Sequence, residues 1–302
     1  MTSDSSRDTS DSLNRPFKGR GRQYLPLLVC PIDRTPLAPA EGGAVCTADP
    51  PHHYPMEDGI LRLVTDAQRA AFDAASREHE ARAAAQGWES PDEEAFKRLP
   101  QTGLGGYPED YWPQYAASTA LLWRYLEAIR VRAGALPIGP MGDAAVLGAG
   151  MGWLAYALDV AGYTTLAIDA DIGRRYGLGV FPIARFMRVQ ADPVRPPLAP
   201  GVLDLVLFQE GLARTRSEDD EAAALARAIE ALRPGGWLAV MDAFPESLEV
   251  VEALRARLQA AGLRLMDHPK RLQWRDRLAE QLDRMLSRNG TIPLVTVAQK
   301  PE

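Results

Sequence analysis

Residues 141–302 alternate short apolar runs with helix-forming stretches, and this alternation constrains the fold more than any other feature of the chain. Continuously apolar runs separated by helices indicate a parallel sheet that is covered on both faces. The expected strands are Ala144–Gly148, Thr164–Asp169, Phe186–Ala191, Leu203–Gln209, Trp237–Asp242, Leu263–Asp267 and Pro293–Ala298. The expected helices are Trp153–Ala161, a short one after Asp169, Glu218–Leu232, Glu246–Ala261 and one around Arg271–Leu286. Ligands of such sheets bind at the loops that follow the carboxyl ends of the strands.

The first strand-to-helix turn contains three glycines, Gly148, Gly150 and Gly152, followed by Trp153. Glycines permit a tight turn and a close approach of a ligand, and the next helix presents unpaired N–H groups. In the dinucleotide-binding pattern G-x-G-x-x-G, the third glycine would fall at Trp153, whose indole would obstruct close packing. The turn therefore disfavours a nicotinamide or flavin cofactor. Taken alone, it is also consistent with a tight turn that binds nothing.

Two acidic residues follow the next two predicted strands. Asp169 ends the second strand, nineteen positions after Gly150, where a carboxylate can accept both hydroxyls of a ribose. Asp192 follows the third strand, where a carboxylate can accept a hydrogen bond from an exocyclic amine such as that of adenine. The alternative for each acid is a loop cap, which is the commoner role of a single aspartate.

The order of motifs in residues 141–245 resembles that of class I S-adenosylmethionine-dependent methyltransferases. The motifs are GAGMGW, AIDAD, QADPVRPPLAPGVLDLVLF and LRPGGWLAVMD. The resemblance implies an α/β, Rossmann-like, seven-stranded sheet with an antiparallel last strand, and it implies S-adenosyl-L-methionine as the cofactor. Met151 and Tyr176 depart from the Asn and Asp of similar bacterial sequences that read G-N-G-W and D-G-L-G.

The resemblance also assigns roles to individual residues of this sequence. Gly148, Ala149, Gly150 and Gly152 would face the methionine part of the cofactor, and Asp169 would bind its ribose. Asp192 would bind the adenine amine, and Ala191 would pack beside the base. Gln209 would line the floor of the site next to the transferred methyl group. Glu210, directly after it, is a candidate for a catalytic base, and the alternative is a solvated loop acid.

The segment 25–65 is turn-rich, and its brief apolar runs predict a small antiparallel β-ribbon. It resembles the zinc ribbons of small methyltransferase-activator proteins, with the pattern CPxC…CxxC…YPIxDGIP. Cys30 and Cys46 are retained, but Asp33 and Asp49 occupy two of the four cysteine positions. A Cys/His/Asp site that uses the nearby His52 and His53 is conceivable. Because half of the thiolates are missing, we expect a degenerate ribbon without a metal.

The other segments complete the predicted organisation. Residues 1–24 form a polar tail that we expect to be disordered, and 66–140 form a helical linker or lid before the methyltransferase domain at 141–302. The second helix of the linker is expected at about 113–132. Its aromatic residues could line a substrate pocket or form core between helix and sheet; they are Tyr107, Tyr111, Trp112 and Tyr115.

Composition limits the function classes. The chain has 302 residues, 46% of them hydrophobic, and it shows no run suited to a membrane span. Its opening residues do not resemble a signal peptide, so we expect a cytoplasmic protein. A net charge of −6 and a pI of about 5.4 disfavour RNA as a partner, although arginines cluster near the end of the chain.

Three functions are consistent with the sequence. The first is a methyltransferase acting on a small molecule, and the second is an RNA methyltransferase. The third is a non-catalytic protein that binds the cofactor or a partner. No motif identifies the acceptor atom.

Overall fold

The computed structural model describes residues 23–132, 141–180, 185–209, 212, 215, 217–241, 248–266 and 295–302. Four strands precede the large α/β region, namely β1 (Leu37–Ala40), β2 (Gly43–Cys46), β3 (His53–Glu57) and β4 (Ile60–Arg62). The later strands are β5 (Gly142–Leu147), β6 (Tyr163–Asp169), β7 (Met187–Gln190), β8 (Leu203–Phe208), β9 (Leu232–Met241), β10 (Arg264–Leu265) and β11 (Val295–Gln299). The α-helices are α3 (Asp66–Ala85), α4 (Glu93–Lys97), α5 (Tyr111–Arg132), α6 (Trp153–Val160), α7 (Glu218–Ala231) and α8 (Leu248–Ala260).

The predicted strands of the α/β region form one sheet in the order β7-β6-β5-β8-β9-β11-β10. The pairs from β7 to β9 are parallel, whereas β11 lies antiparallel between β9 and β10. In chain order this is 3-2-1-4-5-7-6, which confirms the predicted fold class. The helix expected around Arg271–Leu286 lies outside the described residues.

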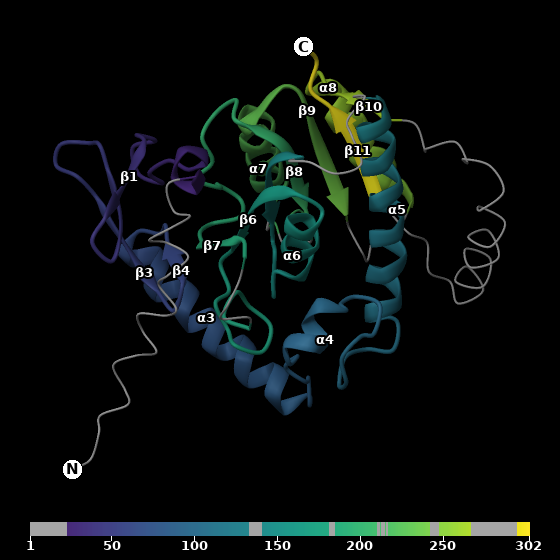
Figure 1. Cartoon of the computed structure of the whole chain (residues 1–302), viewed down its shortest axis with the longest axis horizontal. Helices are drawn as coiled ribbons and strands as arrows, with labels where there is room; N and C mark the ends of the chain where they lie inside the picture. The colour runs from purple at the N-terminus through teal and green to yellow at the C-terminus, as the bar shows by residue number, and fades with distance from the viewer. Residues whose placement is uncertain are drawn as a thin grey trace, which may run out of the picture.

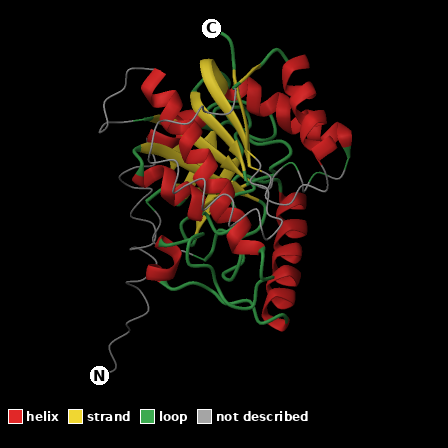
Figure 2. Cartoon of the chain, turned by 90° about the vertical axis from the view of Figure 1, so that its right-hand side faces the viewer, coloured by secondary structure: helices red, strands yellow, loops and turns green. Residues whose placement is uncertain are grey.

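Helices cover both faces of the sheet (Figures 1 and 2), and its strands bury apolar side chains on both sides. In β5, Ala145 and Leu147 pack on one side with the apolar residues of α7 and α8. Ala144 and Val146 pack on the other side with those of α5 and α6. This two-sided core explains the continuously apolar runs of the sequence.

The ribbon segment is joined to this sheet. Its strands β1 to β4 pair in sequence as an antiparallel meander, and β4 then pairs in parallel with β7, Leu61 opposite Val189. The apolar run at Leu25–Val29 begins with the short 3-10 helix η1 (Leu25–Leu27) instead of a strand. Pro26, which lacks a backbone N–H, favours this first turn.

Helix α3 lies at one end of the sheet, away from the two layers of helices that cover its faces. In Figure 1, the arrow of β9 points toward the lower part of the molecule, where α3 and α4 lie. Because β5 to β9 are parallel, this is the end at which all their carboxyl termini lie. The predicted helical linker therefore reaches the edge where ligands of such sheets bind.

Candidate functional site at the carboxyl edge of the sheet

The three glycines after β5 form a turn that only glycine adopts without strain. Gly148, Gly150 and Gly152 have φ angles of +68°, +52° and +84°. The N–H groups of Gly148 and Ala149 both donate to Ile168 O, which fixes the turn beside β6. A Cβ at Gly152 would lie 2.8 Å from the ring of Phe186. The turn thus needs glycine for both its backbone angles and its packing.

Asp169 links this turn to the end of β6. Its side chain is 2% exposed, and its Oδ2 accepts a 2.8 Å hydrogen bond from the Gly150 N–H. Its Oδ1 accepts a 2.9 Å bond from the Asp171 N–H. Each carboxylate oxygen can accept more than one hydrogen bond, so hydroxyl donors are chemically compatible with this group. The predicted ribose ligand and the predicted glycine turn are therefore in direct contact.

The remaining predicted cofactor residues lie at neighbouring strand ends. Ala191 is buried after β7, and its N–H donates to Asp169 O. Asp192 Oδ1 accepts a 3.0 Å hydrogen bond from the Val194 N–H. This is the geometry of a loop cap, the alternative role considered for this acid. Gln209 follows β8, is 4% exposed and donates its N–H to Leu147 O. Within the described part of the chain, Gln209 Oε1 is buried without a hydrogen-bond partner.

A cavity of about 400 Å³ adjoins Asp169 beneath α3. This volume lies within the usual range of small-molecule sites. Its walls combine aromatic rings with charged and hydroxyl groups from α3 and from the segment after β6. The lining residues are Phe72, Ala75, Ser76, His79, Arg82, Trp88, Asp169, Ala170, Asp171 and Tyr176.

Polar contacts attach α3 to the segment after β6. His79 Nδ1 pairs with Asp171 Oδ2 at 2.6 Å, and the Ile172 N–H donates to Ser76 Oγ at 3.1 Å. Burial raises the pKa of the Asp171 carboxyl, but the hydrogen bonds from His79 and from the Gly173 N–H outweigh burial and lower it overall. Residues 170–180 form turns instead of the expected short helix, because Asp169 and Asp171 accept bonds from local N–H groups.

The aromatic group of the linker divides between the cavity and the core. Tyr111 OH lies 2.9 Å from Tyr176 OH, and Tyr107 stacks on Trp88 with ring centroids 4.4 Å apart, so both reach residues that line the cavity. Trp112 and Tyr115 are buried in the core, where Tyr115 contacts the ring of Trp153. The core role is therefore found for Trp112 and Tyr115, and a substrate-pocket role for Tyr107 and Tyr111 stays a prediction.

Several features of this edge were not found from the sequence. His79, Ser76 and Arg82 look like ordinary residues of an alanine-rich helix, and no local signal places them near Asp169. Asp171 belongs to the AIDAD motif, and this second acid, two positions after the predicted ribose ligand, was the one indication that the sequence offered. The candidate base Glu210 lies outside the described residues.

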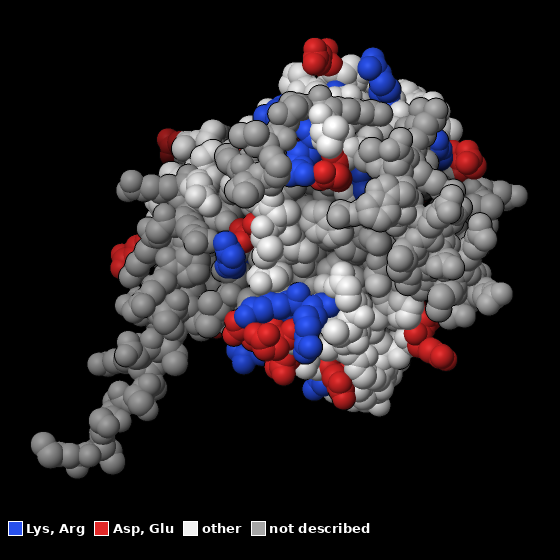
Figure 3. Space-filling view, turned by 45° about the vertical axis from the view of Figure 1, so that its right-hand side comes forward, with Lys and Arg blue, Asp and Glu red and all other residues white. Residues whose placement is uncertain are grey.

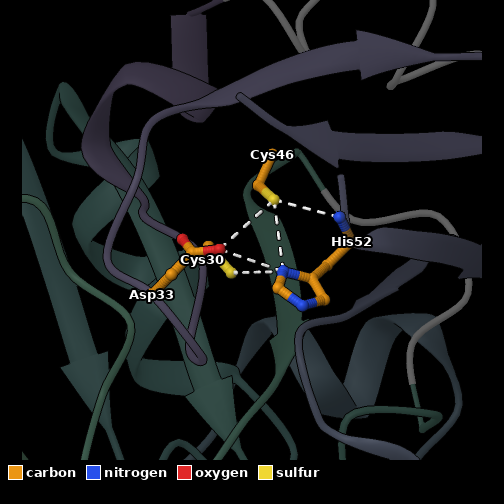
Figure 4. Close-up of side chains that lie close together, drawn as sticks. All are labelled: Cys30, Asp33, Cys46 and His52. Atoms are coloured by element: carbon orange, nitrogen blue, oxygen red, sulfur yellow. Dashed lines mark hydrogen bonds and ion pairs between the residues drawn. The ribbon is translucent and has the colours of Figure 1, made fainter. Parts of the chain in front are cut away.

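A second cluster of functional side chains lies in the ribbon. Cys30, Asp33, Cys46 and His52 point toward one another, and their ligand atoms all lie within 4.8 Å of one another (Figure 4). Both cysteines are free and buried. Desolvation raises the pKa of the Cys46 thiol, but the N–H groups of His52 and Ala48 outweigh it and lower the pKa to about 7.

Comparisons with known proteins give structural likeness only. No family model and no curated protein matches the sequence. A chain of the complex containing the Haloferax volcanii Trm112 methyltransferase activator is 17% identical with a TM-score of 0.42, and the match covers 64% of this chain and 97% of that one. Phosphoethanolamine N-methyltransferase 2 of Haemonchus contortus is 16% identical with a TM-score of 0.38, over 60% and 53% of the two chains. An S-adenosylmethionine-dependent methyltransferase of Mesorhizobium loti is 14% identical with a TM-score of 0.40, and the match covers 58% of this chain and 98% of that one.

Proposed function

We propose that this chain is a class I S-adenosylmethionine-dependent methyltransferase that acts on a small molecule. The observation that carries this proposal is the hydrogen bond between Gly150 and Asp169, which joins a three-glycine turn to an acid at the next strand end. The strand order 3-2-1-4-5-7-6 places both at the central carboxyl edge of the sheet. The TM-scores above are all below 0.5, so the proposal rests on this chain's own geometry and motifs.

The residues at the edge fit the chemistry of this cofactor. Gly148, Gly150 and Gly152 would hold its methionine part, and Asp169 would accept from its ribose hydroxyls. Gln209 Oε1 supports the fit, because a buried acceptor without a partner in the described part of the chain costs free energy unless a ligand donates to it. Asp192 and Ala191 stay predictions for the adenine end.

The cavity beneath α3 supports the same assignment. It is lined by Asp169, the proposed ribose ligand, together with the rings of Phe72, Trp88 and Tyr176. A nucleoside combines hydroxyls that donate to a carboxylate with a flat base that packs on aromatic rings. We therefore place the nucleoside part of the cofactor next to α3.

Methyl transfer from this cofactor requires the protein mainly to position the two reactants. When bound, S-adenosylmethionine supplies a methyl group that its sulfonium already activates. The chain's residues would hold the acceptor in line with this group and exclude water from the reacting atoms. Tyr107 and Tyr111 are candidates for the wall that does so, since both lie beside the cavity. Glu210, which lies outside the described residues, stays a candidate for a base.

Charge supports a small-molecule acceptor over RNA. The net charge is −6, and the face shown in Figure 3 carries acidic and basic side chains side by side. A surface that binds RNA usually gathers basic residues on one face. Of the terminal arginine cluster only Arg264 is described; the others, together with Lys270, lie outside the described residues. No helix among the described residues is long and apolar enough to span a membrane.

The test compares S-adenosylmethionine, S-adenosylhomocysteine and NADH in a thermal-shift experiment. A ligand at about one hundred times its dissociation constant stabilises a fold by about 2.7 kcal/mol, equivalent to several degrees. We expect a shift with the two adenosyl ligands only, and we expect Asp169→Asn to reduce it. If neither S-adenosylmethionine nor S-adenosylhomocysteine shifts the melting temperature, the proposal is contradicted.

A second experiment distinguishes the three functions. Protein is incubated with methyl-labelled S-adenosylmethionine and either an extract of small metabolites or purified RNA. Label in the small-molecule fraction supports the proposal, whereas label in RNA, with salt-sensitive retention of RNA, favours the RNA enzyme. Cofactor binding without label in either fraction favours a non-catalytic binding protein.

A further inference from the structure

The four side chains that converge in the ribbon come from separate parts of its backbone. Cys30 follows η1, Asp33 lies in the next turn, Cys46 ends β2, and His52 immediately precedes β3. Figure 4 shows the two sulfur atoms, one imidazole nitrogen and one carboxylate oxygen facing a common centre. Two thiols, an imidazole and a carboxylate are four ligands of three types, and Zn²⁺ binds all three types.

Four of the six distances between these atoms are close to the edges of a tetrahedral metal site, and all six are within 4.8 Å. Cys46 Sγ lies 3.4 Å and Cys30 Sγ 3.6 Å from His52 Nδ1. Asp33 Oδ2 lies 3.7 Å from Cys46 Sγ and 3.0 Å from His52 Nδ1. Zinc bonds of about 2.0–2.3 Å place tetrahedral ligands about 3.3–3.8 Å apart, since each edge is about 1.6 bond lengths. Three of the four separations lie in this range, and the fourth is slightly shorter.

Neighbouring groups hold the ligands in this arrangement. The Tyr54 hydroxyl lies 2.9 Å from Cys30 Sγ, and the His52 N–H donates to Cys46 Sγ at 3.1 Å, so each sulfur has a donor of the kind that supports a metal-bound thiolate. Asp33 Oδ1 accepts from the Thr35 N–H at 2.9 Å and from its hydroxyl at 2.6 Å. Because Thr35 occupies Oδ1, the other oxygen, Oδ2, is directed at the cluster.

The fold also decides which residues take part. The ribbon pattern places Asp33 and Asp49 at two of its four cysteine positions, and the sequence therefore favours a site without metal. In the structure Asp49 is exposed and is not part of the cluster, and His52 supplies the fourth ligand atom. Four ligand atoms therefore converge: three come from positions of the ribbon pattern, Cys30, Asp33 and Cys46, and His52 takes the place of Asp49.

We propose that Cys30, Asp33, Cys46 and His52 bind one structural Zn²⁺ in a closed, four-ligand site. Four protein ligands leave no open position for a substrate, so the metal would be structural. It would tie η1, the end of β2 and the start of β3 together. These elements lead into β4, which pairs with β7 at the edge of the large sheet. This inference is independent of the methyltransferase proposal.

The test measures metal content and ligand geometry in the full chain, purified without chelator and with a thiol reductant. We expect about one zinc per chain by elemental analysis. Replacement by Co²⁺ should give the intense visible bands of tetrahedral cobalt and a sulfur-to-cobalt charge-transfer band. A chain that contains no zinc and binds Co²⁺ without these bands would overturn the proposal.

Matched variants identify the ligands. His52→Gln and Asp33→Asn should weaken zinc retention against a chromogenic chelator, whereas His53→Gln and Asp49→Asn should retain the metal like the wild type. The control residues are exposed and lie in the same ribbon. Equal retention in His52→Gln and His53→Gln would contradict the assignment.

A variant that fails to fold would not decide the matter, so the wild type is tested as well. Stepwise modification of its two thiols with a mercurial should release zinc in proportion to the thiols modified. Zinc that stays bound after both thiols have reacted would overturn the assignment of Cys30 and Cys46.

Discussion

The Gly150 N–H donates a 2.8 Å hydrogen bond to Oδ2 of Asp169, across the two neighbouring strand ends at the centre of the sheet. This bond couples the shape of the glycine turn to the orientation of a buried carboxylate. Asp169 therefore has two roles in our interpretation, as a ligand for hydroxyl groups and as a support for the turn. Substitutions at this position need to distinguish these roles.

Asp169→Asn should weaken binding of S-adenosylhomocysteine by about 5- to 150-fold, equivalent to the roughly 1–3 kcal/mol of buried hydrogen bonds that lose their partner. The asparagine keeps one acceptor oxygen, so one of the two backbone N–H groups, that of Gly150 or that of Asp171, loses its acceptor while the side chain keeps its size. Titration calorimetry measures the affinity, and circular dichroism checks the fold. The matched control is Asp49→Asn, which alters an exposed acid of the ribbon that does not line the cavity and should leave the affinity unchanged. An unchanged dissociation constant for Asp169→Asn would contradict the placement of the ribose.

Filling the cavity beneath α3 should prevent cofactor binding. Ala75 is exposed on α3 and lines the cavity, so Ala75→Trp would place an indole in the space assigned to the nucleoside. Ala74 is also exposed but is not among the lining residues, and Ala74→Trp is the matched control. We expect loss of the thermal shift with S-adenosylhomocysteine in the first variant and a normal shift in the second. Equal shifts in both variants would place the nucleoside elsewhere.

The hydrogen bond between Tyr111 and Tyr176 should contribute a measurable coupling between α5 and the segment after β6. The two hydroxyl oxygens are 2.9 Å apart, and Tyr176 is mostly buried. A double-mutant cycle of Tyr111→Phe and Tyr176→Phe should give a coupling free energy of about 0.5–1.5 kcal/mol in urea unfolding. Additivity within about 0.3 kcal/mol would show that the contact contributes nothing to stability.

Asp143 should make the protein less stable as pH rises. Burial and the nearby Asp204 carboxylate raise the pKa of Asp143 in the folded state. At any pH above the folded-state pKa, the ionised Asp143 carboxylate lowers the free energy of unfolding. This penalty is absent at pH values below the pKa of the unfolded chain, about 3.9. Asp143→Asn should therefore stabilise the protein near pH 7, by up to about 0.5 kcal/mol.

The gain from Asp143→Asn should shrink as the pH falls through the folded pKa toward the unfolded one. Urea unfolding at a series of pH values measures the gain. Glu41→Gln removes the same charge from an exposed turn and serves as the control. A gain that does not change with pH, or that Glu41→Gln reproduces, would contradict the explanation.

Local chemistry allowed the sequence to determine the sheet and its central turn. Apolar runs and helix formers specify strands and helices over a few residues each, and all seven predicted strands of the α/β region are present. The glycines at 148, 150 and 152 specify a turn with positive φ angles, and Asp169 follows at the spacing of the next strand end. These features depend on backbone preferences and side-chain periodicity, which neighbouring residues encode.

Only the tertiary structure decided which distant residues meet. His79 and Asp171 are 92 positions apart, and their contact places α3 over the cavity beside Asp169. In the ribbon, the path of the chain brings His52 to the cluster and leaves Asp49 exposed, although Asp49 occupies the position given by the motif. Contacts of this kind depend on how whole elements pack, and a short stretch of sequence does not encode that packing.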